Sequence, residues 1–373
     1  MFKGCTSLTE VSTISAVTAS TESFGAMFKG CTALVNAPTL PATTLAATCY
    51  SETFMGCTSL LNVPAIPAKS MKTSCYQRMF AGCTSLVTGP VICATTLAAS
   101  CFYEMFKDCT SLLNASELSA TKMYPNCYER MFVGCTALVT APTLASTSVT
   151  GSCYAEMFKD CTSLVNAPDL PSGTLKANCY QGMFSGCISL ETAPVISGKS
   201  LATHCFASMF SGCTGLETPP QMMTTIATAY TYSYSHMFDG CTSLESTPIM
   251  PAKTLQANCY EAAFSGCSSI TDMPILSGTG LNNYCYANMF SDCTSLTGIT
   301  DLPATTMKTG CYMGMFSGCT SLETAPVLSA TNLVASSYTS MFDGDENLSY
   351  IKCLATGITA ADCTTNWAKK LSL

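Results

Sequence analysis

The sequence predicts an α/β repeat solenoid, with short parallel strands on one face and short helical turns on the other. Three observations predict it: a constant repeat, a strand-like segment in every copy and a helix-like segment in every copy. The string MFxGCTSL and its variants at Thr53, Ala263 and Met341 make 14 copies in the 373-residue chain, at a step of 26 residues with one exception of 28. A step this constant implies one coil per repeat, each burying its apolar face against its neighbours. The copies begin at Met1, Met27, Thr53, Met79, Met105, Met131, Met157, Met183, Met209, Met237, Ala263, Met289, Met315 and Met341.

Each copy contains one segment of each kind. Residues 33–41 and their counterparts are short, apolar at spaced positions and closed by Pro, which suits a strand and its turn. Residues 44–54 carry Leu45, Cys49 and Phe54 at a spacing close to one face of a short helix. Gly30 and its counterparts mark the turn back to the strand. The repeated Leu of the box should then form a core ladder, one residue per coil: Leu34, Leu60, Leu86 and Leu112.

The repeat predicts one solenoid over residues 1–344, followed by a C-terminal capping segment over 345–373. At that end Asp345 and Glu346 replace the Cys-Thr of the box. The segment ITAADCTTNWAKKL that follows has the start, apolar spacing and terminal Lys of a short capping helix, which would hold Trp367. The first copy starts at Met1 with no comparable cap. We therefore expect a fragment of a longer protein, or else an N-terminal face that packs on another chain or domain.

Composition excludes several classes of function. Only 10% of residues are charged, with 16 Lys+Arg against 23 Asp+Glu. A nucleic-acid surface needs clustered cations, so we expect no nucleic-acid partner. No run of about 18 apolar residues occurs, which predicts no membrane insertion. The first residues lack the features of a signal peptide.

The 26 cysteines fall mainly into two rows, one in the CTSL box and one in the CY pair that precedes each box. Ser replaces the CY cysteine at Ser233 and Ser337 without a matching loss in the other row, which disfavours obligate pairing. We expect two ladders of small, buried, reduced thiols, and partial disulfides are the alternative. The spacing offers no closed ligand set with His, so no metal site is predicted.

Two rows are candidate binding strips. The first is aromatic and follows the CY cysteine or its Ser replacement. It is either an exposed strip for sugars or apolar protein anchors, or a stacking ladder between coils with its hydroxyls in water. The second row follows the core Leu and is apolar in the first half of the chain. If this row is exposed, it marks a contact surface. Otherwise its residues are strand formers that the next coil partly covers. Glu191, Glu217, Glu245 and Glu323 continue this row, and a polar row from Asn36 to Thr218 runs beside it. The candidate residues are Tyr76, Phe102, Tyr128, Tyr154, Tyr180 and Phe206 in the aromatic row, and Val35, Leu61, Val87, Leu113, Val139 and Val165 in the apolar row.

Catalysis finds little support. His204 and His236 have no readable Ser or Asp partner, and no nucleophile-elbow, zinc-protease, P-loop or dinucleotide motif occurs. Asp169, Asp272 and Asp301 lie in rows beside the strands, and a regular solenoid face offers no pocket to tune an acid and a base. We predict no enzyme activity and no catalytic, cofactor-binding or metal-binding residue.

The MFxGCTSL box, the LxxAPxL strand and the apolar lead to the next box resemble the BspA-like bacterial leucine-rich repeat surface proteins. The resemblance covers residues 1 to about 350. It implies a leucine-rich-repeat solenoid and a non-enzymatic module for surface binding or adhesion, with a host or bacterial surface protein or glycan as partner. It also implies an extracellular, cell-surface or virion-surface location. The alternative is a structural spacer or fibre component of a cell-surface or phage particle assembly.

Overall fold

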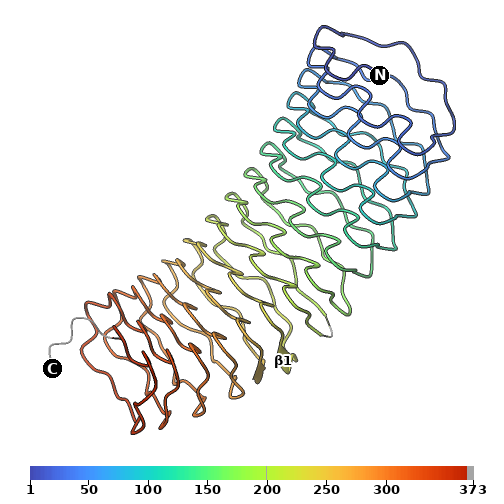
Figure 1. Ribbon diagram of the computed structural model, residues 1–373. Coiled ribbons are helices and arrows are strands. Elements are labelled where there is room, and N and C mark those ends of the chain that lie inside the picture. The colour runs from blue at the N-terminus through green and yellow to red at the C-terminus, as the bar shows by residue number, and fades with distance from the viewer. Residues whose placement is uncertain (199, 368–373) are drawn as a thin grey trace. The chain divides into compact units, whose positions relative to one another are not determined.

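Each 26-residue repeat forms one coil. The computed structural model describes residues 1–198 and 200–367. The chain divides into two compact units, Met1–Pro194 and Val195–Leu373, and within each unit successive coils lie side by side (Figure 1). The expectation of one repeat per coil is therefore confirmed within both units.

The strand side of each coil is reduced almost to single residues. In the described part of the chain the strands are β1 (Thr228–Ala229) and β2 (Thr254–Leu255), which pair in parallel. Elsewhere the coils meet in isolated parallel bridges, such as Asn36 with Asn62 and Ile66 with Ile92. In many coils a proline lies between these positions, and because a proline has no N–H to donate to a ladder, it limits strand length there.

The segments predicted to be helical are runs of four-residue turns. Within one run, Gly25 and Met27 donate their N–H groups three residues back, to Glu22 and Phe24. The alternate residues donate to the next coil instead, as Phe24 N does to Cys49 O at 2.9 Å. The described residues form no helix, so the predicted helical turns are not confirmed: every second N–H is used between coils rather than within a helix. None of the described residues belongs to a helix long and apolar enough to cross a membrane.

Every fourth residue of each turn run has a left-handed backbone conformation, with positive φ. In the third copy these residues are Thr48, Glu52 and Gly56, with φ of 54°, 56° and 73°. Their side chains lean onto the following coil, and a large residue is often followed there by Gly. An added Cβ at Gly186 would overlap the carboxylate of Asp160, and one at Gly310 would overlap the ring of Tyr284.

Rows of identical side chains fill the core of each unit. The Leu ladder predicted from the box is confirmed, since Leu34, Leu60 and Leu86 are fully buried. Phenylalanines of the box stack coil upon coil, with Phe28 and Phe54 5.4 Å apart between ring centroids and 6° from parallel.

The C-terminal segment continues the coil pattern instead of forming the predicted capping helix. Leu328 bridges to Cys353 in parallel, and Phe342 N donates to Trp367 O at 2.9 Å. Asp362 and Asn366 occupy left-handed positions of a further turn run. The helix prediction is thus wrong up to Trp367, and residues 368–373 lie outside the described residues.

Candidate binding surface

The aromatic row lies in the core, so the prediction of an aromatic binding strip is wrong. Tyr76, Tyr128, Tyr154 and Tyr180 are 1% exposed and Phe102 and Phe206 are 0% exposed. Within the first unit the rings stack from coil to coil, as Tyr50 and Tyr76 do at 5.4 Å between centroids. The four-residue turn directs both the CY cysteine and the following ring inward, whereas a strand or helix would have placed them on different sides.

The hydroxyl groups of this row are not in water either. The Tyr180 hydroxyl donates to the carbonyl of Pro171 at 2.8 Å, inside the coil. The hydroxyls of Tyr50, Tyr260 and Tyr312 are buried without a hydrogen-bond partner. Burial raises the pKa of these tyrosines above the ordinary value, so they stay neutral.

The second predicted row lies on the surface of the first unit. Leu61, Val87, Leu113 and Val139 are 47%, 40%, 44% and 45% exposed. Val35 and Val165, at the two ends of the row, are half-buried. Backbone bonds hold neighbours in register, since Leu61 N donates to Val35 O and Leu113 N donates to Val87 O, each at 2.9 Å. We call these six residues the apolar stripe.

Polar, uncharged rows flank the apolar stripe. On one side lies the row that begins with Asn36, where Asn62 Nδ2 donates to Asn36 Oδ1 at 2.7 Å. On the other side lie the Ser or Ala and the Thr of the box, and Thr136 Oγ1 donates to Thr110 O at 3.3 Å. None of the described positions of these flanking rows carries a charge between residues 32 and 166.

The stripe's row becomes acidic farther along the chain. Glu191 is exposed in the first unit, and its N–H donates to Val165 O at 2.9 Å. In the second unit Glu217, Glu245 and Glu323 are exposed at the same row position.

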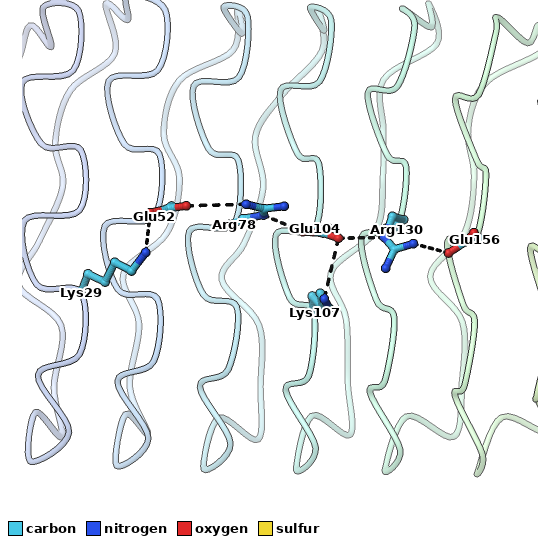
Figure 2. A network of polar contacts seen from close by, with 7 residues as sticks. All are labelled: Lys29, Glu52, Arg78, Glu104, Lys107, Arg130 and Glu156. Atoms are coloured by element: carbon cyan, nitrogen blue, oxygen red, sulfur yellow. Dashed lines mark hydrogen bonds and ion pairs between the residues drawn. The ribbon is translucent and has the colours of Figure 1, made fainter.

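A ladder of alternating charge lies on the turn side of the first unit (Figure 2). Arg78 Nε donates to Glu104 at 2.6 Å and Arg130 Nε donates to the same carboxylate at 2.7 Å. The Glu104 side chain is only 4% exposed. Burial alone would raise its pKa, but the two Arg hydrogen bonds outweigh burial and the pKa is lowered. The ladder continues outward through Arg78 to Glu52 and Lys29, through Arg130 to Glu156, and sideways to Lys107.

This ladder was not predicted from the sequence, although a signal for it is present. Its signal is Glu, Arg, Glu, Arg and Glu at the residue just before each box start, over five successive copies. These residues sit at left-handed backbone positions, where long charged residues are uncommon. The alternation of charge pairs each coil with both of its neighbours.

The cysteine rows are buried free thiols. In the first unit Cys57 Sγ donates to the carbonyl of Phe28 in the preceding coil at 3.1 Å, and in the second unit Cys267 Sγ donates to Phe238 O at 3.0 Å. Burial raises the pKa of Cys57 to about 12. Only Cys5 is exposed, and Cys93 and Cys353 are half-buried.

The residues considered for catalysis do not converge. His236 Nδ1 lies 2.9 Å from Asp239 Oδ2, and this contact raises the pKa of His236. His204 is not part of that pair, and burial lowers its pKa. Asp169, Asp272 and Asp301 are exposed. Among the described residues no group of three or more His, Cys, Asp or Glu could hold a metal ion.

Comparison with known proteins points to one family. The model for the BspA type leucine rich repeat region matches residues 1–105, 98–217, 207–323 and 234–360. Similar solved structures include a leucine-rich repeat protein from Bacteroides ovatus (19% identity, 88% of this chain and 86% of that chain, TM-score 0.46). Another is a leucine rich cell surface protein from Faecalibacterium prausnitzii (16% identity, 86% and 79% coverage, TM-score 0.41). No curated protein matches the chain. Because the family model covers nearly all of the sequence, the chain belongs to the BspA-type leucine-rich repeat proteins.

Proposed function

We propose that the chain is a non-enzymatic binding module at a cell or particle surface, and that its apolar stripe recognises an uncharged, partly apolar segment of a partner protein. The observation that carries this proposal is the exposure of Leu61, Val87, Leu113 and Val139 in four consecutive coils. Isolated exposed apolar residues need no explanation, but a continuous exposed row indicates a contact surface.

The surroundings of the stripe define the chemistry of the partner. Amide and hydroxyl side chains border it on both sides, and no charged residue interrupts these rows. Such a surface fits the interface anatomy of an apolar centre with a polar rim. It offers no charge to pair with, which argues against a strongly charged partner. Leucine-rich repeats of this family are generally non-enzymatic binding scaffolds, which supports a binding role.

The stripe also argues against a spacer that uses only its ends. A spacer gains nothing from exposed Val and Leu on a lateral face. Even as strand formers partly covered by the next coil, these residues have an exposure of 40–47%, which leaves an apolar surface open for contact.

The test is binding of the purified chain to arrayed host and bacterial surface proteins, with two variants compared. Leu113→Lys places a charge in the centre of the stripe, and Val91→Lys places the same charge at a 62% exposed position outside it. We expect Leu113→Lys to weaken binding at least about tenfold, equivalent to roughly 1.4 kcal/mol, while Val91→Lys leaves it unchanged.

Two outcomes would contradict the proposal. Self-association that Leu113→Lys abolishes, seen by sedimentation, would make a second copy of this chain the occupant of the stripe. Absence of any bound protein, with a monomeric chain, would favour the structural spacer.

A further inference from the structure

One row of the second unit carries aromatic rings on the surface instead of in the core. It is the first left-handed position of each turn run, which in the first unit holds small or polar residues such as Thr48, Ser74 and Ser100. In the second unit the same row reads His204, Tyr232, Asn258, Tyr284 and Gly310. The two tyrosines, His204 and Asn258 are half-buried.

The rings are oriented along the row. His204 stacks on Tyr232 with 4.7 Å between centroids and 14° between planes. One face of Tyr232 is therefore covered, and the opposite face is directed toward the coil of Asn258. The ring of Tyr284 leans over Gly310, on the far side from Asn258. In the order of the row, Tyr284 thus bounds Asn258 on the side opposite Tyr232.

The spacing between the two tyrosines suits one non-planar ring. They lie two coils apart, which is about 10 Å at the usual interstrand spacing. A ring inserted between them would have about 5 Å on each side. Stacked aromatic rings of successive coils in this protein lie 4.7–6.1 Å apart between centroids, and the thicker ring of a pyranose fits the same spacing.

Polar groups around the row match the hydroxyls of a sugar. Asn258 Nδ2 donates to Glu261 Oε2 at 2.8 Å, which leaves the Oδ1 atom of Asn258 to accept from a ligand. Gln256 Oε1 accepts from the N–H and the hydroxyl of Thr231, at 3.2 and 3.0 Å, which leaves its amide nitrogen to donate. The carboxylate of Glu261 beside them disfavours an anionic sugar.

From this arrangement we infer that Tyr232, Asn258 and Tyr284 form a site for one neutral pyranose residue of a glycan. Aromatic faces bind the apolar C–H surface of the sugar, and the amides bind its hydroxyls. The site lies in the second unit and is independent of the apolar stripe, so it adds a second ligand class to the proposed binding role.

The experiment is binding of the full chain to a printed array of neutral gluco-, manno-, galacto- and N-acetylglucosamine oligosaccharides, with sialylated oligosaccharides as the anionic arm. We expect binding to at least one neutral series and none to the sialylated arm. Tyr232→Ala and Tyr284→Ala should each weaken binding about tenfold, from the loss of one stacking face.

The decisive variant is Asn258→Tyr. The row already holds Tyr at positive φ in Tyr232 and Tyr284, so the backbone accepts this substitution, and the new ring would fill the space between them. Ser100→Tyr, at the equivalent row of the first unit, is the matched control. We expect Asn258→Tyr to abolish glycan binding without lowering the melting temperature, and Ser100→Tyr to leave binding unchanged.

Three results would overturn the inference: no neutral glycan binds, Asn258→Tyr binds as well as the parent chain, or only the sialylated arm binds. Leu113→Lys separates this inference from the proposed function. Loss of a protein partner in that variant, with no glycan bound by the parent chain, would leave the apolar stripe in place and reject the pyranose site.

Discussion

The Nε atom of Arg130 donates a 2.7 Å hydrogen bond to Glu104 in the preceding coil, and Glu104 is the least exposed member of the charge ladder. Arg78 holds the same carboxylate from the other side. Arg78 and Arg130 therefore connect three successive coils through the Glu104 side chain.

Glu104→Gln should lower the free energy of unfolding by about 1–2 kcal/mol, because the carboxylate charge is lost and only one of the two oxygens that accept from Arg78 and Arg130 remains, while both Arg side chains are partly exposed. Chemical denaturation measures the change. Glu117→Gln, at an exposed position, is the control. Equal unfolding curves for Glu104→Gln and the parent chain would show that the ladder adds nothing to stability.

The same carboxylate gives a pH dependence of known sign. Its pKa is lowered in the folded chain, so the stabilisation is present above the ordinary Glu value and is lost as the pH falls through the folded value. We expect the parent chain to lose stability below about pH 4 more steeply than Glu104→Gln does. Parallel curves in that range would contradict the assignment.

Asp345 predicts the opposite pH dependence. It stands where the other boxes have Cys, it is buried, and neither carboxylate oxygen has a hydrogen-bond partner. Burial raises its pKa to about 8, with Asp343 adding to the rise. A raised carboxyl pKa means that stability falls as the pH rises from about 4 to 8. Asp345→Cys should restore the row and add about 2–4 kcal/mol at pH 8, measured by thermal or chemical unfolding. A variant no more stable than the parent chain at pH 8 would refute this.

The buried cysteines should react slowly with thiol reagents in the folded chain. Cys5, Cys93 and Cys353 should react first with a thiol reagent, because the other cysteines are buried. After denaturation without reductant, most of the 26 cysteines should titrate as free thiols. Recovery of fewer than half would favour disulfides instead.

Gly310 provides a local test of the packing between coils. Its φ is +57° and an added Cβ would overlap the Tyr284 ring, so Gly310→Ala should destabilise the second unit by about 1–2 kcal/mol. Gly151→Ala is the matched control, since a Cβ there meets only the Ala177 carbonyl oxygen at 3.7 Å. A similar melting temperature for both variants would show that Tyr284 simply moves aside.

Much of the fold could be predicted from the sequence, because repetition reveals which positions are equivalent. The repeat length and the Leu ladder were predictable in this way, whereas the sequence left open whether the apolar stripe is exposed. The turn runs were not, since Cys49, Thr53 and Cys57 recur every four residues, and this period is too close to the 3.6 residues of a helix to distinguish the two.

The aromatic row shows the same limit at the level of side chains. Whether Tyr76 or Tyr128 points inward depends on the turn geometry of the preceding residues, and Ser74 and Asn126 reach that geometry with positive φ that nothing in their identity requires. The charge ladder is visible in the sequence as an alternation of Glu and Arg. The burial of its side chains, however, depends on the positive-φ turn conformation, which the sequence does not reveal.

The lean of the left-handed side chains onto the following coil limits how such an array can grow. Where Asp160 precedes Gly186 and Asp292 precedes Gly318, the larger side chain occupies the space that a Cβ in the next coil would need. Duplicating an Asp-bearing repeat would place Asp against Asp, whereas Gly follows Gly without conflict, as Gly56 follows Gly30. Recombination should therefore preserve folding when an Asp-bearing repeat moves together with the Gly-bearing repeat that follows it, whereas repeats that carry Gly at this position can move singly.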